Sequence, residues 1–244
     1  MVTLKEMTTE KEMKKFVKFP FSIYQNNAYW VPPIIKEELE VLNKKYNPAF
    51  ENAEARFFIA VKNGKTVGRI AAIINWHEVN NQQIKKMRFG WYDVIDDIEV
   101  SNILIKKVKE IGKENDLVYI EGPVGFSNLD KVGVLTEGFK HIGTMVTWYS
   151  LPYYKEHLEQ LGLIKEKEYL ENKFKLSNVD GPYYERISKL IQHRYKLRSL
   201  NFSKTKDIMP FVGEMFELFN KTYVTLSSYV PISDNQINYF KKKY

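Results

Sequence analysis

The sequence predicts a mixed α/β fold, an α+β arrangement in which a mostly antiparallel central sheet is flanked by helices and followed by an additional helical segment at the carboxyl end. Two strand-forming runs flank Asn63-Gly64, the dipeptide most typical of a tight hairpin turn. Apolar residues at helical spacing over 98–113 lie between two further strand-like runs, which predicts a crossover helix between parallel strands. After residue 180 helical patterns predominate.

The composition is that of a globular protein, with 244 residues, 44% hydrophobic and 27% charged. The absence of cysteine excludes disulfides, zinc sites built on thiolates and cysteine nucleophiles. No run approaches the roughly 18 apolar residues of a membrane span, and the first residues lack an apolar signal core. We therefore expect no membrane association and a cytoplasmic location.

The charge balance, 37 basic against 30 acidic residues for a net +7, predicts either a lysine-rich solvated surface or a preference for an anionic ligand such as a phosphate-bearing cofactor. The basic residues are dispersed, so no nucleic-acid partner is predicted. No histidine pair has the spacing of metal ligands, and no metal site is predicted. His77, His157 and His193 are expected to be solvated.

The first 94 residues are expected to form two helices followed by three antiparallel strands. Thr9 with Glu12 three positions on is typical of a helix start, and the prolines of Trp30-Val31-Pro32-Pro33 end the helical run. A strand, the Asn63-Gly64 turn and a return strand then form the hairpin. The expected helices are 9–18 and 36–45, and the expected strands are 56–61, 66–75 and 87–94.

Beyond residue 94 the pattern alternates between helix and strand. The crossover helix leads to an apolar strand that enters the Gly122-Pro123 turn, and turn formers at 178–182 mark a domain boundary. We divide the chain there into 1–180 and 181–244. The remaining expected helices are 153–161, 183–196, 208–223 and 230–240, and the remaining strands are 117–121, 144–150, 169–176 and 197–202.

The order strand, helix, aromatic-proline loop and helix occurs twice, at 2–45 and again at 197–244. Tyr229-Val230-Pro231 stands in the second copy where Trp30-Val31-Pro32 stands in the first. This repeat predicts either that residues 181–244 are a connecting helix and the opening elements of a second domain of the same kind, or that their helices pack on the first domain.

Several motifs carry a family resemblance. The hairpin from Phe57 to Ala72 resembles the central hairpin of the GNAT superfamily. Nearly the whole chain is similar to a bacterial family with two tandem GNAT-like domains, on these motifs: Trp30-Val31-Pro32-Pro33, Asn47-Pro48, Gly68-Arg69-Ile70-Ala71-Ala72, Gly122-Pro123, Phe126-Ser127 and Glu137-Gly138-Phe139. The resemblance implies an N-acyltransferase that uses acetyl-CoA or another acyl-CoA and acts on a small-molecule or peptide amine.

The same resemblance implies where the cofactor lies. GNAT proteins bind acyl-CoA between two parallel strands, which here end near Asp93 and Glu121, with the pyrophosphate on backbone amides at the start of the crossover helix. Residues 121–128 form a glycine-spaced loop that is expected either to line a ligand or to be a structural turn. The implied cofactor contacts are Val94, Ile95, Gly122, Gly125, Ser127 and Asn128.

Candidate catalytic residues come from two places. The resemblance implies a tyrosine that protonates the departing thiolate; taking Gly162 as the family's glycine puts Leu158 at that position, with Tyr154 one turn earlier as its substitute. Glu137 and His141 are four apart and, in a helix, would act as a general base and its orienting partner for the amine; the alternative is a surface or packing role. Tyr154 also belongs to an aromatic cluster with Trp148, Tyr149 and Tyr153 that is expected to fill the core or line the cleft.

The residues expected to hold the pyrophosphate leave a second interpretation open. The stretch 93–102 has no glycine and no basic residue but four acids, Asp93, Asp96, Asp97 and Glu99. Acids at a helix start are good caps but repel a phosphate. The alternative function is therefore a GNAT-fold module for binding or assembly that does not use acetyl-CoA.

Overall fold

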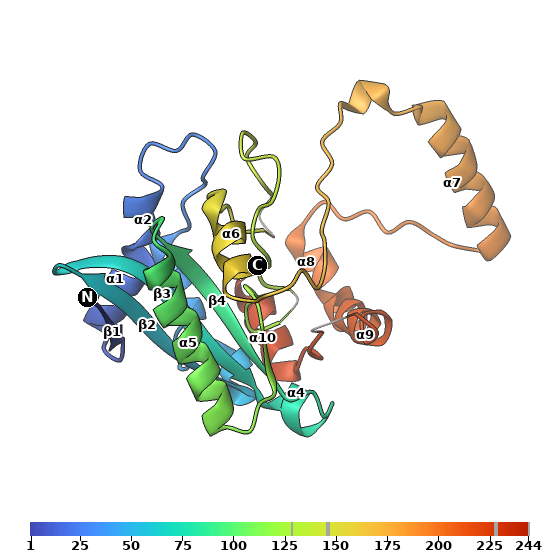
Figure 1. Ribbon diagram of the computed structural model, residues 1–244. Coiled ribbons are helices and arrows are strands. Elements are labelled where there is room, and N and C mark those ends of the chain that lie inside the picture. The colour runs from blue at the N-terminus through green and yellow to red at the C-terminus, as the bar shows by residue number, and fades with distance from the viewer. Residues whose placement is uncertain (128, 145–146, 227–228, 244) are drawn as a thin grey trace.

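The computed structural model describes residues 1–127, 129–144, 147–226 and 229–243 (Figure 1). Its centre is a five-stranded sheet in the order β1-β2-β3-β4-β5, antiparallel except for the parallel pair β4 and β5. The predicted fold class, a mixed and mostly antiparallel sheet flanked by helices, is confirmed. The strands are β1 (Val2–Glu6), β2 (Ala53–Lys62), β3 (Lys65–Asn75), β4 (Lys86–Val94) and β5 (Tyr119–Glu121).

The β2–β3 hairpin turns at the predicted dipeptide. Asn63 and Gly64 both have positive φ angles, 52° and 74°, as a two-residue turn that matches the twist of its strands requires. Side chains then alternate between the two faces of the sheet, so that Phe57 and Ile59 join one buried cluster while Phe58 and Ala60 join another. The sheet is therefore covered on both sides.

One face of the sheet is covered by the crossover helix α5 (Ile98–Glu114), which connects β4 to β5 (Figure 1). The helix begins at Asp97, whose side chain accepts the N–H of Glu99, and it buries an apolar stripe that includes Leu104 and Val108. Gly68 lets it approach, because a Cβ at that position would lie 2.9 Å from a Leu104 methyl group. The parallel pair with its crossover helix is the arrangement that the GNAT resemblance implies.

Four short helices and one 3₁₀ turn complete the first part of the chain. The Thr9 capping box predicted from the sequence is present and begins the first helix, which packs Phe16 against Phe57 on the face opposite α5. These elements are α1 (Glu10–Lys18), α2 (Pro20–Ile23), α3 (Ile35–Val41), η1 (Pro48–Glu51) and α4 (Trp76–Asn80).

The predicted helix at 153–161 is α6 (Tyr153–Gln160), which lies on the α5 side of the sheet. Two strands expected beyond it do not form, because 169–176 and 197–202 are exposed, irregular chain with no described strand beside them to complete a ladder. Of the strand expected at 144–150, residues 145 and 146 lie outside the described residues. Among the rest of that range only Thr147 makes a bridge, to Val132.

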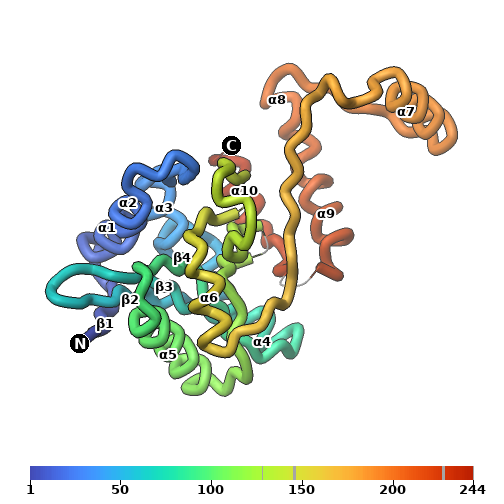
Figure 2. The backbone as a smooth tube through the Cα atoms, turned by 45° about the horizontal axis from the view of Figure 1, so that its top comes forward, coloured from blue at the N-terminus to red at the C-terminus, as the bar shows by residue number. Residues whose placement is uncertain are grey.

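The carboxyl-terminal segment is helical. Its elements are η2 (Leu176–Asn178), α7 (Gly181–Tyr195), α8 (Thr205–Ile208), η3 (Met209–Phe211), α9 (Val212–Thr222) and α10 (Asp234–Lys243). The single helix expected at 208–223 is divided, because Pro210 lacks the N–H that a continuous helix needs. Helices α9 and α10 share a small core around Phe216 and Ile232, whereas α7 projects away from the sheet (Figure 2).

Candidate functional site

The candidate site lies where β4 extends beyond its parallel partner. Pairing between β4 and β5 covers three residue pairs and ends at Arg88 with Glu121, whereas β4 continues to Val94. A β-bulge interrupts β4 on its other side, since Ala71 of β3 pairs with Gly90 but Arg69 pairs with Asp93. Trp91 within the bulge has a φ of 45°. A bulge changes the direction of the side chains that follow it in the strand. Here the residue affected is Asp93.

The free edge at the end of β4 is occupied by tyrosines of α6. The backbone N–H of Val94 donates to Tyr154 Oη at 3.1 Å, and Tyr153 Oη donates to the Val94 carbonyl at 2.7 Å. The first turn of α6 is thereby fixed to this strand end. Tyr154 is fully buried, with 1% of its surface exposed.

Asp93 is the centre of a buried polar group that we call the Asp93 cluster, formed by Tyr24, Arg69, Asp93 and Tyr154. Arg69 Nε donates to Asp93 Oδ2 at 2.7 Å. Tyr24 Oη lies 3.0 Å from Asp93 Oδ1 and 3.0 Å from Tyr154 Oη, and Tyr154 Oη lies 3.5 Å from Asp93 Oδ1. A chain of hydrogen bonds from Tyr24 through Tyr154 to Asp93 satisfies all three side chains.

Both phenols of the cluster are held in their protonated form. Burial raises the pKa of Tyr154 well above its usual value of 10.0, and the Asp93 charge adds to the effect. Burial and then Asp93 raise the pKa of Tyr24 in the same way. The two tyrosines are therefore proton donors at neutral pH and not bases.

A second polar chain connects α6 to α5. His157 Nδ1 lies 2.8 Å from Ser101 Oγ, Tyr92 Oη donates to the same Ser101 oxygen at 2.8 Å, and His157 Nε2 lies 3.2 Å from Asp96 Oδ1. The expectation that His157 is solvated is wrong, because only 5% of it is exposed. It lies three residues after Tyr154, so it shares the buried helix face.

The charged groups and the Glu99 amide at the start of α5 are already paired within the chain. Lys62 Nζ lies 2.7 Å from Asp97 Oδ2 and 3.4 Å from Glu99 Oε2, and the Lys62 hydrogen bond lowers the pKa of Asp97. The Asp97 side chain also takes the free N–H of Glu99. This helix start offers neither a free amide cradle nor positive charge to a pyrophosphate.

The predicted cofactor residues fall into two groups. Val94 and Ile95 lie at the end of β4 beside Tyr154, whereas Gly125 and Ser127 lie at the other end, where Arg88 Nη1 donates to the Gly125 carbonyl at 3.1 Å. Arg88 and Val94 are six residue steps apart along β4, about 20 Å.

The loop that contains the second group is packed onto the sheet. A Cβ at Gly122 would collide with the Phe89 carbonyl, and the Ser127 N–H donates to Asp130 Oδ2 at 2.9 Å. Asn128 lies outside the described residues. The described part of the loop is therefore stabilised by its own contacts.

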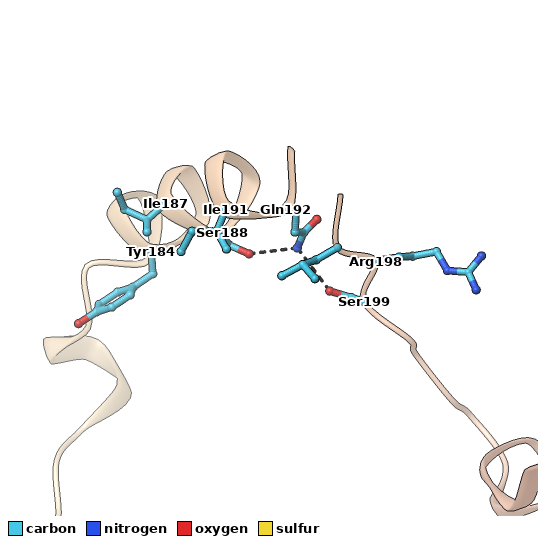
Figure 3. Close-up of a pocket in the computed structure, with 8 residues that line it drawn as sticks. Tyr184, Ile187, Ser188, Ile191, Gln192, Arg198 and Ser199 are labelled. Carbon is cyan, nitrogen blue, oxygen red and sulfur yellow. Dashed lines mark hydrogen bonds between the residues drawn. The ribbon is translucent and has the colours of Figure 1, made fainter. Parts of the chain in front are cut away.

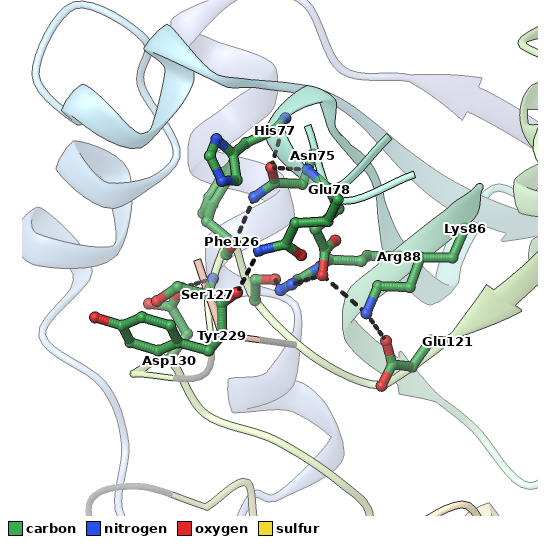
Figure 4. A network of polar contacts seen from close by, with 12 residues as sticks. Asn75, His77, Glu78, Lys86, Arg88, Glu121, Phe126, Ser127, Asp130 and Tyr229 are labelled. Carbon is green, nitrogen blue, oxygen red and sulfur yellow. Dashed lines mark hydrogen bonds and ion pairs between the residues drawn. The ribbon is translucent and has the colours of Figure 1, made fainter. Parts of the chain in front are cut away.

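A buried ion network fixes this loop and β5 (Figure 4). Arg88 donates twice to Glu78, at 2.8 and 2.6 Å, and Lys86 Nζ lies 2.8 Å from Glu78 and 2.5 Å from Glu121. Asn75 Nδ2 adds a bond to the Phe126 carbonyl at 3.2 Å. The network joins α4, β4 and β5, and it anchors the loop through the Gly125 and Phe126 carbonyls.

Glu137 and His141 lie in an exposed turn and not in a helix. The His141 N–H donates to the Gly138 carbonyl at 2.9 Å, and Tyr149 Oη anchors the turn through the Phe139 carbonyl at 3.0 Å. Among the described residues of this turn, no hydrogen bond or ion pair joins Glu137 to His141. Their role as a base and its partner stays a prediction.

The described residues contain neither a metal-binding cluster nor a membrane-spanning helix. No group of three or more histidine, aspartate or glutamate side chains is arranged there to hold a metal ion. Likewise, none of the helices in the described ranges has the length and apolar character to cross a membrane.

Comparison with known proteins gives two curated relatives. Protein YghO of Escherichia coli (strain K12) is 26% identical over 228 residues, covering 93% of this chain and 57% of the relative. Bacterial ceramide synthase of Caulobacter vibrioides is 25% identical over 200 residues, covering 80% of this chain and 52% of the relative. The chain thus spans about half the length of these relatives. No protein-family model matches it.

Among solved structures, the fold is similar to several acetyltransferases. A putative acetyl transferase from Pyrococcus furiosus has a TM-score of 0.43 and 16% identity, covering 71% of this chain and all of that one. A predicted acetyltransferase with acetyl-CoA from Clostridium acetobutylicum has a TM-score of 0.44 and 12% identity, covering 74% and 99%. A tandem GNAT protein from clavulanic acid biosynthesis has a TM-score of 0.45 and 10% identity, covering 66% and 43%.

Proposed function

We propose that this chain belongs to an N-acyltransferase of the GNAT type that transfers an acyl group from an acyl-CoA to the amino group of a long-chain amine. The Asp93 cluster carries the proposal, because it places two protonated phenols at the free end of β4, beside the crossover helix. The similarity to a bacterial ceramide synthase supports the acceptor class, since a ceramide is the amide of a fatty acid and a long-chain amino alcohol.

The proposed reaction is direct transfer. The amine nitrogen attacks the thioester carbonyl carbon, the C–N bond forms and the C–S bond breaks, and the leaving thiolate takes a proton while the amine loses one. We assign Tyr154 as the donor to the thiolate and Tyr24, at 3.0 Å, as the group that reprotonates Tyr154. Exchange with solvent after product release then returns a proton to Tyr24 and takes up the proton that the amine has lost. Glu137 with His141 is the proposed route for the amine proton.

The residues at the start of α5 do not fit the phosphates of CoA. Asp97 and Glu99 take the free amide and the Lys62 charge there, and the Val94 N–H is bonded to Tyr154. We therefore assign no phosphate contact at this helix, and Tyr154 must release Val94 if a ligand is to lie along β4. These same contacts favour the second candidate, a GNAT-fold module that binds or assembles without acyl transfer.

The test is an amide-forming assay with acetyl-CoA and palmitoyl-CoA as donors and a long-chain amino alcohol as acceptor, with the product measured by mass spectrometry. We expect product with the long-chain acceptor, and Tyr154→Phe to lower kcat by about 100-fold or more with KM nearly unchanged, as loss of a general acid does. Tyr153→Phe is the matched control, because it removes a phenol of the same helix turn that bonds only a carbonyl.

Calorimetry with both donors separates the two candidate functions. If a donor binds but no product forms, the protein has an acyl-CoA site, and the proposed long-chain amine acceptor is rejected. Absence of both binding and product with the intact protein would reject acyl transfer and favour the module.

A further inference from the structure

Helix α7 is the element of the chain that is least attached to the rest of the fold. Figures 1 and 2 show it at the far end of an arm whose two connecting segments run back to the sheet and to α8. None of its residues is buried. It nonetheless has a well-formed start, with Pro182 in the first turn and the Tyr183 N–H bonded to Asp180 Oδ1 at 3.0 Å.

One side of α7 is apolar. Its tyrosine, isoleucine and leucine residues recur three or four positions apart and so form one stripe along the helix. Figure 3 shows the middle of this stripe, where Ile187 and Ile191 line a shallow pocket together with Ser199 of the returning chain, and Gln192 bonds Ser188. Leu190 and Tyr195 remain exposed, at 62% and 61%. The full stripe is Tyr183, Tyr184, Ile187, Leu190, Ile191 and Tyr195.

The same segment carries much of the positive charge of the protein. Residues 181–198 contain five lysine and arginine residues and one acid, a net charge of +4 out of +7 for all 244 residues. The one acid, Glu185, is already paired with Lys189 at 2.6 Å. Arg186 and Arg194 lie over tyrosine rings at 6.0 and 5.6 Å, and neither has a carboxylate partner among the described residues.

We infer that α7 is a membrane-surface helix that binds bilayers containing anionic lipids. A bilayer surface accepts both the apolar residues and the charges, because the acyl region takes the apolar stripe and the anionic headgroups take Arg186 beside it and Arg194 near its carboxyl-terminal end. Tyrosines suit the boundary between these layers, and long basic side chains reach back to the headgroups. A nucleic acid would leave the apolar stripe in water, and an apolar protein surface would leave the cations without partners.

The inference concerns a peripheral attachment and not a span, since α7 has 15 residues and several charges. It departs from the expectation of no membrane association, which considered only an apolar span and a signal core. It agrees with the proposed long-chain acceptor, which would itself be held in a membrane. Its test does not depend on catalysis, however, because vesicle binding is measured without any acyl transfer.

The experiment is sedimentation of the full chain with vesicles of phosphatidylcholine alone and of phosphatidylcholine with phosphatidylglycerol in equal parts. We expect binding only to the anionic vesicles and its loss at about 1 M salt, where charges are screened beyond about 3 Å. The double variant Arg186→Glu/Arg194→Glu is expected to weaken partitioning at least about tenfold. Leu190→Gln is expected to weaken it as well.

The matched control is Lys106→Glu/Lys109→Glu, which makes the same change in net charge on the exposed side of α5. This control is expected to bind as the unchanged chain does, and circular dichroism verifies that every variant is folded. The inference is overturned if the unchanged chain stays in the supernatant when anionic vesicles are sedimented. It is overturned as well if the α7 and α5 charge variants lose binding equally. It is also overturned if the chain ignores vesicles and forms a dimer that Leu190→Gln dissociates, because the stripe then joins two copies.

Discussion

Asp93 is a buried carboxylate on β4 that contacts side chains from three other parts of the chain. Arg69 is its neighbour on β3, Tyr24 follows α2, and Tyr154 comes from α6. Burying a charge without a partner is costly, so the cluster is satisfied only when all of these elements are in place. The sequence indicated Tyr154 through the family resemblance, but nothing local to Asp93 or Tyr24 showed that they would meet.

The raised pKa values of Tyr24 and Tyr154 predict a loss of stability at alkaline pH. Each phenol keeps its proton in the folded state above its usual pKa of 10.0, whereas the unfolded chain releases it there. The stabilisation is fully present below pH 10 and declines above it, by up to about 1.4 kcal/mol per pH unit for each phenol. Urea unfolding at a series of pH values from about 8 to 11 measures this slope.

The variant Tyr24→Phe/Tyr154→Phe should flatten that alkaline slope, although not completely, because burial also raises the pKa of Tyr92. Tyr195→Phe is the control, since its ring is 61% exposed and its loss should leave the slope unchanged. An equal slope in all three proteins would contradict the burial of the two phenols.

At the scale of elements, the predictions succeeded where the signal was local. The Asn63-Gly64 turn, the Thr9 capping box and the stripe of α5 each depend on residues close together in sequence. The predictions of strands at 169–176 and 197–202 were wrong, because a strand needs a neighbouring strand to pair with, and its own sequence does not show whether one is present. His157 was misjudged for a related reason, since only the packing of α6 on α5 buries it.

Gly90 tests the contact between β4 and the loop after β5. A Cβ there would lie 2.5 Å from the Val124 carbonyl oxygen, so Gly90→Ala must push the loop off the strand. We expect a loss of about 1 to 3 kcal/mol in the free energy of unfolding, as for other overpacked sites. Gly213→Ala in α9 is the control, because no atom lies within 4 Å of the added carbon, and it should be neutral or slightly stabilising. Equal effects of the two changes would show that the loop is not held against β4.

At the scale of the whole molecule, the chain beyond residue 180 has two kinds of attachment. Helix α10 contacts the first part through Asn235 and Glu51 at 2.7 Å, and Gln82 reaches the Tyr229 carbonyl at 3.3 Å. The arm with α7 instead extends from the end of α6 away from the sheet (Figure 2). The division into 1–180 and 181–244 therefore stays a proposal, in which α9 and α10 open a second domain that rests on the first.

Limited trypsin digestion of the full chain tests that division. The basic residues of the arm, such as Lys173, Lys175 and Arg198, are exposed in irregular chain, where local opening costs little. Arg69, Lys86 and Arg88 are buried in the sheet with 4% or less of their surface exposed, so cleavage there requires global unfolding. We expect the first cuts within 165–204, giving an amino-terminal fragment that stays folded by circular dichroism while α9 and α10 remain bound to it. First cuts within the hairpin or α5 would contradict both the proposed boundary and the exposure of the arm.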